Sequence, residues 1–207
     1  SLLSAPAAIL VAKIMVPETE EPATARGGAF QVELKTVNVI DAAAAGAIDG
    51  LRIGAFVGAM LIAFVALVAL LNGALATAGG WVGVPDLTFQ RVLGTLRAPL
   101  AFVMGVPWAE ASEVGSLLGI KTVLNEFLAY QELGVLIGEG ALSPRSAIIA
   151  SYALCGFANF GSLAILIGAI GAVAPKRRPD LARMGLASIL SGSLATFMTG
   201  CVAGILL

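Results

Sequence analysis

The sequence contains no histidine among its 207 residues, which excludes imidazole-based metal sites, hydrolytic triads and pH switches. Charged residues make up 12%, against about 25% in soluble domains, and no basic stripe is present to neutralise a nucleic acid. Cys155 and Cys201 lie in separate apolar stretches and are predicted to be packing residues rather than a disulfide. No phosphate-binding glycine loop or metal-ligand cluster is present. We therefore expect no enzymatic activity, no cofactor and no nucleic-acid partner.

Apolar residues are abundant instead. They make up 58% of the chain, and the mean hydropathy is +0.96. Soluble domains carry about 45–50% apolar residues, so lipid is the natural solvent for the excess. We predict an all-α integral membrane protein that crosses the cell inner (plasma) membrane several times. Because the first residues already resemble the inside of a membrane helix, we expect the chain to be the C-terminal part of a longer protein.

The first predicted part covers residues 1–106. It contains membrane helices, a polar loop over 18–35 and a charge-free span over 53–78, longer than the ~20 residues that cross a bilayer. Residues 87–100 place apolar side chains at helical spacing with arginines on the other face, which predicts an interfacial helix. Four basic residues within 176–183 favour the cytoplasmic side for that turn, and counting spans back places the 18–35 loop there too.

The second predicted part covers residues 107–207, which the family resemblance given below identifies with part of a transport domain. Scattered acidic residues make 107–143 too polar for one span and predict two short helices that form a re-entrant hairpin. Residues 147–174 are apolar but contain a central cluster of poor helix formers, so we predict a broken helix. The last span is predicted over 184–207. Irregular backbone at membrane depth is tolerated only where protein or a water-filled cavity surrounds it.

Glu126 is the strongest candidate site residue, because a carboxylate inside a membrane segment costs ~2.5–3.5 kcal/mol and usually faces a cavity or the bundle interior. At helical spacing Thr122, Glu126 and Tyr130 would form one polar stripe, and the neighbouring Asn125 can both donate and accept hydrogen bonds. Lys121 is expected at the hairpin tip or the interface. The alternative is that Glu126 lies at the interface and only solvates the hairpin.

Asn159 and Ser162 form the second candidate cluster. With Gly156 and Gly161 they lower helix propensity at the centre of an apolar stretch. A local break would turn both polar side chains into the protein interior. Ordinary contact between membrane helices is the competing interpretation, since glycine, serine and asparagine are enriched at such contacts. The residues alone leave the two interpretations open.

Two strings resemble the C-terminal half of the concentrative nucleoside transporters. They are Gly119-Ile-Lys-Thr-Val-Leu-Asn-Glu-Phe-Leu-Ala-Tyr130 and Ser151-Tyr-Ala-Leu-Cys-Gly-Phe-Ala-Asn-Phe160. Shorter matches are Ser4-Ala-Pro-Ala, Asn38-Val-Ile-Asp-Ala-Ala, Gly105-Val-Pro-Trp108 and Leu142-Ser-Pro-Arg145. The resemblance runs in order along nearly the whole chain.

The resemblance implies a homotrimer that imports nucleosides together with sodium or protons. It also implies that Glu126 binds ribose hydroxyls through its carboxylate, that Asn159 and Ser162 bind the ribose, and that Phe157 lies nearby. We add Asn125 to the expected substrate-binding residues because it adjoins Glu126. A non-transporting membrane subunit that uses the same fold for assembly or regulation is the alternative function.

The sequence departs from the family pattern at one position and lacks one part of it. Phe160-Gly161-Ser162 stands where the family usually has Phe-Ser-Ser, so one hydroxyl is missing. The family's first hairpin and the helix that follows it do not match any part of this chain. The resemblance therefore implies that base recognition and the coupling-ion site lie upstream of Ser1.

Overall fold

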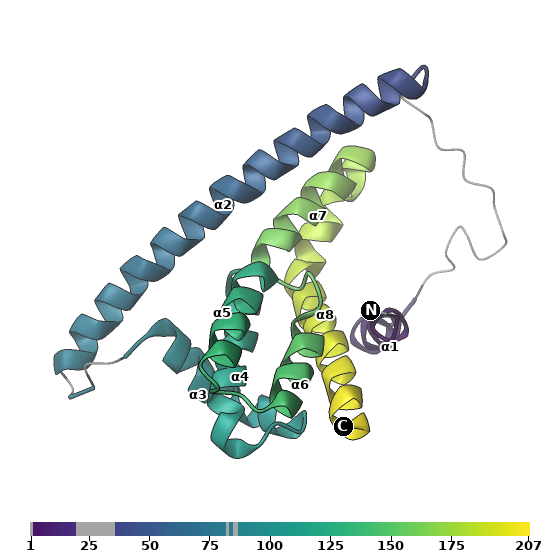
Figure 1. Ribbon diagram of the computed structural model, residues 1–207. Coiled ribbons are helices and arrows are strands. Elements are labelled where there is room, and N and C mark those ends of the chain that lie inside the picture. The colour runs from purple at the N-terminus through teal and green to yellow at the C-terminus, as the bar shows by residue number, and fades with distance from the viewer. Residues whose placement is uncertain (1, 20–35, 82, 85–86) are drawn as a thin grey trace. The chain divides into compact units, whose positions relative to one another are not determined.

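Helices account for all the regular structure in the described part of the chain. The structure is a computed structural model that describes residues 2–19, 36–81, 83–84 and 87–207. It has no strand within these residues, which confirms the predicted all-α class. The helices, drawn in Figure 1, are α1 (Ser4–Met15), α2 (Val39–Trp81), α3 (Phe89–Val103), α4 (Trp108–Val123), α5 (Glu126–Gly138), α6 (Pro144–Leu154), α7 (Phe160–Val173), the 3₁₀ helix η1 (Pro175–Arg177) and α8 (Arg178–Leu206).

The chain divides into two compact units, and α2 belongs to both. The smaller unit is Glu18–Leu70, and the larger comprises Ser1–Pro17 and Leu71–Leu207. In the smaller unit Asn38 caps α2 by accepting the backbone N–H of Asp41, whose carboxylate accepts the N–H of Val37. The span expected over 53–78 lies inside α2. The loop expected over 18–35 lies outside the described residues from position 20 onward.

The last helix, α8, buries small and polar residues and exposes large apolar ones. Its buried positions include Ser193, Thr196 and Gly200, whereas Leu186 and Leu190 are 69% and 53% exposed. This arrangement suits a helix whose outer face meets lipid and whose inner face packs closely on other helices. Among the described residues α8 is long and apolar enough to cross a membrane alone, and α3 and α4, bent by 115°, pass the same test as a pair.

Helices α6 and α7 follow one another along α8 (Figure 1). Close contacts at glycines of α8 set this packing. A Cβ at Gly185 would lie 2.9 Å from the Leu163 side chain of α7, and a Cβ at Gly200 would lie 3.3 Å from the Ala153 side chain of α6. Because α8 contacts both α6 and α7, it fixes the position of the segment that connects them.

Helices α4 and α5 pack together as the two arms of a helical hairpin. The open end of this hairpin, where α4 begins and α5 ends, is hydrogen-bonded to the start of α6. Ser143 caps α6 by accepting the N–H of Ser146 at 3.3 Å. Its own N–H and hydroxyl donate to the Glu110 carboxylate in the first turn of α4, at 3.0 and 2.9 Å. Arg145 of α6 donates to the carbonyls of Gly105, in the turn before α4, and of Gly204, near the end of α8. These hydrogen bonds therefore attach the open end of the hairpin to α6 and α8.

Helices α3 and α4 approach so closely that backbone meets backbone. A Cβ at Gly115 of α4 would lie 2.7 Å from the carbonyl oxygen of Gly94 and 2.9 Å from the backbone nitrogen of Ala98, both in α3. The three nearest atoms are all backbone atoms of α3, which cannot move aside as the end of a flexible side chain could. Gly134 of α5 has no heavy atom within 4 Å of the corresponding position, so it offers a matched control.

We expect Gly115→Ala to lower the free energy of unfolding of the full-length protein by about 1–3 kcal/mol, the usual range for overpacking a core. Gly134→Ala should leave it unchanged or raise it by up to about 1 kcal/mol, because alanine is the better helix former. Thermal unfolding of the purified protein in detergent measures both. Equal effects of the two substitutions would contradict the close packing of α3 on α4.

Candidate functional site

The turn between α4 and α5 is a helix start built on Asn125. Helix α4 ends at Val123, and the Asn125 side chain accepts the backbone N–H of Leu128 at 3.0 Å, so it is the N-cap of α5. Glu126 is then the first residue of α5. Because an N-cap lies between them, Thr122 and Glu126 belong to different helices. The predicted continuous stripe of Thr122, Glu126 and Tyr130 is therefore wrong.

The interruption between α6 and α7 is built in the same way. Residues 155–159 are not helical, and the Asn159 side chain accepts the backbone N–H of Ser162 at 2.8 Å as the N-cap of α7. Gly156 lies against α8 so closely that a Cβ there would come within 2.5 Å of the Thr196 methyl group. The asparagine thus starts the second helix, and the glycine lets the irregular segment pack on α8.

The two helix starts meet through one side-chain contact. Asn159 Nδ2 donates to Glu126 Oε2 at 2.8 Å, and Asn159 is only 1% exposed. The Asn159 carboxamide therefore uses its oxygen to cap α7 and its nitrogen to hold the carboxylate of α5. A carboxylate is stabilised near helix N-termini, where unpaired N–H groups and the helix dipole create positive potential. The structure brings together the two residues that the sequence singled out separately.

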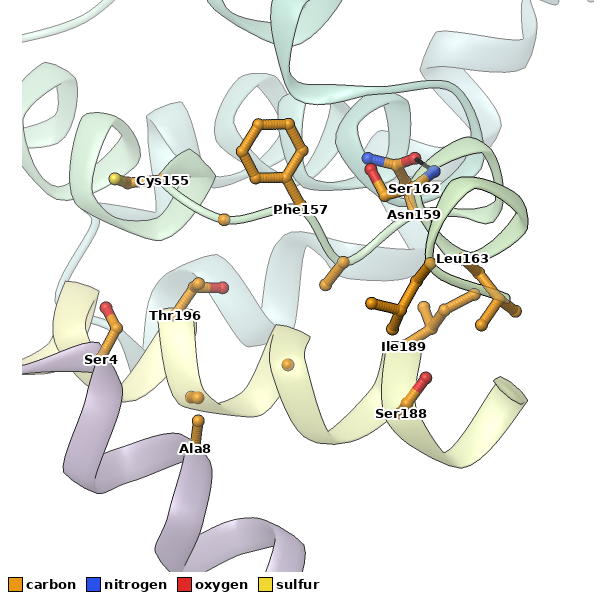
Figure 2. Close-up of a pocket in the computed structure, with 15 residues that line it drawn as sticks. Ser4, Ala8, Cys155, Phe157, Asn159, Ser162, Leu163, Ser188, Ile189 and Thr196 are labelled. Carbon is orange, nitrogen blue, oxygen red and sulfur yellow. Dashed lines mark hydrogen bonds between the residues drawn. The ribbon is translucent and has the colours of Figure 1, made fainter. Parts of the chain in front are cut away.

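A cavity of about 270 Å³ lies between α1, the 155–162 segment and α8, shown in Figure 2. Phe157, Asn159 and Ser162 line it, whereas Asn125 and Glu126 do not. Its volume is near the lower end of the ~300–1,000 Å³ typical of ligand pockets. Figure 2 shows the Phe157 ring on the side of the segment away from α8, and the ring is 79% exposed. Three of the five expected substrate-binding residues thus line the cavity, while Glu126 reaches the break through Asn159 and Asn125 caps α5.

Two further side chains hold α4 and α5, the two arms of the hairpin, in place. Tyr130 of α5 donates its hydroxyl to the carbonyl of Ser151 in α6 at 2.7 Å. Arg97 of α3 donates to the Leu118 carbonyl at 3.0 Å and to the Thr122 hydroxyl at 2.9 Å, both near the end of α4. A cation is favoured at a helix C-terminus, so Arg97 stabilises the end of the first arm.

Lys121 is the residue whose place the sequence interpretation misjudged. We expected it at the hairpin tip or the interface, but it is fully buried, and Leu124 and Asn125 form the tip. Its Nζ donates to the Thr196 hydroxyl at 2.8 Å and to the Ala153 carbonyl at 3.3 Å, and lies 5.5 Å from the centre of the Phe197 ring. The one available signal was a lone lysine inside an apolar stretch, which requires buried hydrogen-bond partners.

Gly161, where the resemblance predicts serine, lies directly after the start of α7. A Cβ at this position would be 3.3 Å from Asn159 Oδ1, which is a tight contact. The glycine therefore leaves more room around the Asn159 carboxamide than a serine would. The added space lies next to the side chain that contacts Glu126.

Comparisons with known proteins point to one family. Residues 1–204 match the family model described as "Na+ dependent nucleoside transporter C-terminus". The uncharacterized transporter YutK of Bacillus subtilis is 48% identical over 205 residues, which are 99% of this chain and 50% of that protein. The nucleoside permease NupC of Helicobacter pylori is 41% identical over 208 residues, covering 99% of this chain and 49% of the permease.

A solved structure shares the fold. The structure of CNTnw in an inward-facing substrate-bound state superposes with a TM-score of 0.85 at 49% sequence identity, over 97% of this chain and 47% of that one. The chain spans about half the length of these relatives. The relatives are named as transporters and permeases rather than as enzymes.

The double role of Asn159 can be separated by substitution. Asn159→Ser should keep the cap, since serine is a good N-cap residue, and lose the contact with Glu126, whereas Asn159→Ala should lose both. We expect the free energy of unfolding of the ligand-free full-length protein to fall in the order wild type, serine, alanine, with about 1 kcal/mol between the two variants. Detergent unfolding curves measure it. Identical curves for the serine and alanine variants would show that the cap contributes nothing.

Proposed function

Because the chain belongs to the Na⁺-dependent nucleoside transporter family, whose C-terminal region it matches, we propose that it is the C-terminal half of a nucleoside symporter. In this proposal Glu126, Asn159 and Ser162 bind the ribose, Phe157 lies against the bound nucleoside, and Asn125 fixes the hairpin tip next to it. The observation that carries the proposal is the 2.8 Å contact between Asn159 Nδ2 and Glu126 Oε2. It joins the start of α5 to the start of α7 through a buried carboxamide and a half-buried carboxylate.

The chemistry of the pair suits a sugar. A carboxylate has about four acceptor positions on its two oxygens and no donor, and Asn159 occupies one position on Oε2. The remaining positions can accept hydrogen bonds from the vicinal hydroxyls of a ribose. Hydrogen bonds to a charged group contribute about 1.5–3 kcal/mol each, more than those between neutral groups. The Ser162 hydroxyl lies in the first turn of α7 and lines the cavity together with Asn159, so it can donate or accept toward the sugar.

Broken helices also suit transport. Discontinuous helices whose N-termini point at the substrate recur in secondary transporters, which work by alternating access around such a site. We propose this mechanism here, coupled to sodium or protons, in a homotrimer of the cell inner (plasma) membrane. The description of the family model as Na⁺ dependent supports sodium. Base recognition and the coupling-ion site are assigned to residues upstream of Ser1.

We expect Glu126→Gln in the full-length protein to weaken binding of a ribonucleoside at least about tenfold, because an amide replaces one charged acceptor with a donor. The glutamine oxygen can still accept from Asn159, so the fold should be kept. Isothermal titration with a ribonucleoside and with the 2′,3′-dideoxynucleoside of the same base measures the effect. The loss should be confined to the ribonucleoside, which alone carries the two ribose hydroxyls.

Glu132→Gln is the matched control, since Glu132 lies on the same helix and is exposed. It should bind both nucleosides as the wild type does.

Uptake into proteoliposomes under a sodium gradient or a proton gradient then identifies the coupling ion. Wild-type affinity in Glu126→Gln would refute the ribose assignment, and an intact protein that binds no nucleoside would favour the non-transporting assembly subunit.

A further inference from the structure

The hairpin of α4 and α5 contacts the broken helix on both sides of its break, at the end of α6 and at the start of α7. Lys121 makes the contact with the end of α6. Glu126, at the start of α5, reaches the N-terminal end of α7 through Asn159. Lys121, in the last turn of α4, reaches the C-terminal end of α6 through the Ala153 carbonyl at 3.3 Å. The two charged residues lie on either side of the same tip and bind the two ends of the same interruption.

The sign of each charge fits the end that it binds. The last four carbonyls of a helix have no partner within it and carry partial negative charge, and the first four N–H groups carry partial positive charge. In α6 the Ala153 carbonyl accepts from Lys121, and the Ser151 carbonyl accepts from Tyr130. The carbonyls of Tyr152 and Leu154 accept from backbone N–H groups of the break. Both arms of the hairpin therefore help to terminate α6.

The structure also shows why Lys121 cannot easily move. Its ammonium donates to the Thr196 hydroxyl of α8 at 2.8 Å, and that hydroxyl donates in turn to the Ser193 carbonyl. The Thr196 methyl group packs against Gly156 in the break. The Phe197 ring lies 5.5 Å from the ammonium, within the distance of a cation–π contact. Lys121 thus joins α4, α6 and α8 at the level of the interruption.

We propose that Lys121 is a positioning residue that sets the Glu126 carboxylate relative to Asn159, and so tunes the affinity for the ribose hydroxyls. The inference rests on the proposed function of Glu126. Burying an ammonium is costly even when it is hydrogen-bonded, and an apolar residue of the same size often serves stability equally well. A lysine here therefore indicates a requirement for a fixed hairpin geometry rather than for packing alone.

The test uses Lys121→Met in the full-length protein, since methionine is close in length and uncharged. Binding of a ribonucleoside should weaken roughly tenfold, as expected when a buried charged hydrogen bond that fixes the site is removed. Binding of the 2′,3′-dideoxynucleoside should change little. In a Glu126→Gln background Lys121→Met should have almost no further effect, because a residue that acts through Glu126 is not additive with it.

Thr196→Val and Thr199→Val supply a second variant and its control. Both threonines are buried on α8, but Thr199 contacts Ser4 and not Lys121. Thr196→Val should weaken ribonucleoside binding in the same selective way as Lys121→Met, though less, and Thr199→Val should not. This pair tests the inference even if Lys121→Met fails to fold.

The outcomes separate this inference from the proposed function. If Glu126→Gln alone leaves binding unchanged, the ribose assignment fails and this inference fails with it. If Glu126→Gln weakens binding but Lys121→Met multiplies that loss, or weakens both nucleosides equally, only the role of Lys121 is overturned. A lower melting temperature of the ligand-free Lys121→Met protein with wild-type ribonucleoside affinity would also overturn it, by showing a purely structural role.

Discussion

An interrupted helix leaves backbone N–H and carbonyl groups without helical partners, and the larger unit is organised around that constraint. Each such group, where it is removed from water, needs a protein partner or a lined cavity. Asn125 and Asn159 satisfy N–H groups where α5 and α7 begin. Tyr130 and Lys121 satisfy carbonyls where α6 ends. The same contacts that close the interruptions fix the Glu126 carboxylate in place.

Close helix packing makes these contacts possible. The small residues of α8 let α6 and α7 approach its axis, so the break packs beside Thr196. The glycines of α3 and α4 bring Arg97 to the end of the first hairpin arm. Many large apolar side chains outside this core are exposed, as expected for a surface that meets lipid. The small residues that allow close helix packing therefore also position the residues of the site.

Composition and local propensity predicted the helical class, and the cluster of Asn159 with its glycines drew attention to the segment that separates α6 from α7. The stripe through Thr122 was wrong because periodicity ignored the cap that Asn125 provides, although an asparagine directly before a glutamate is itself a helix-start signal. The burial of Lys121 could not be predicted locally. Its partner Thr196 is 75 residues away in sequence, and only the folded chain brings α8 to the break. Long-range partners of that kind leave no periodic pattern.

The distribution of charge around the break follows one rule. Cations from α3 and α4 lie at helix C-terminal ends, where Arg97 and Lys121 meet carbonyls. The carboxylate of Glu126 lies where α5 and α7 begin. Each charge thus lies at a helix end whose dipole has the opposite sign. A carboxylate at helix starts, with one oxygen position occupied by Asn159, keeps acceptor positions for a ligand that brings only hydroxyl groups.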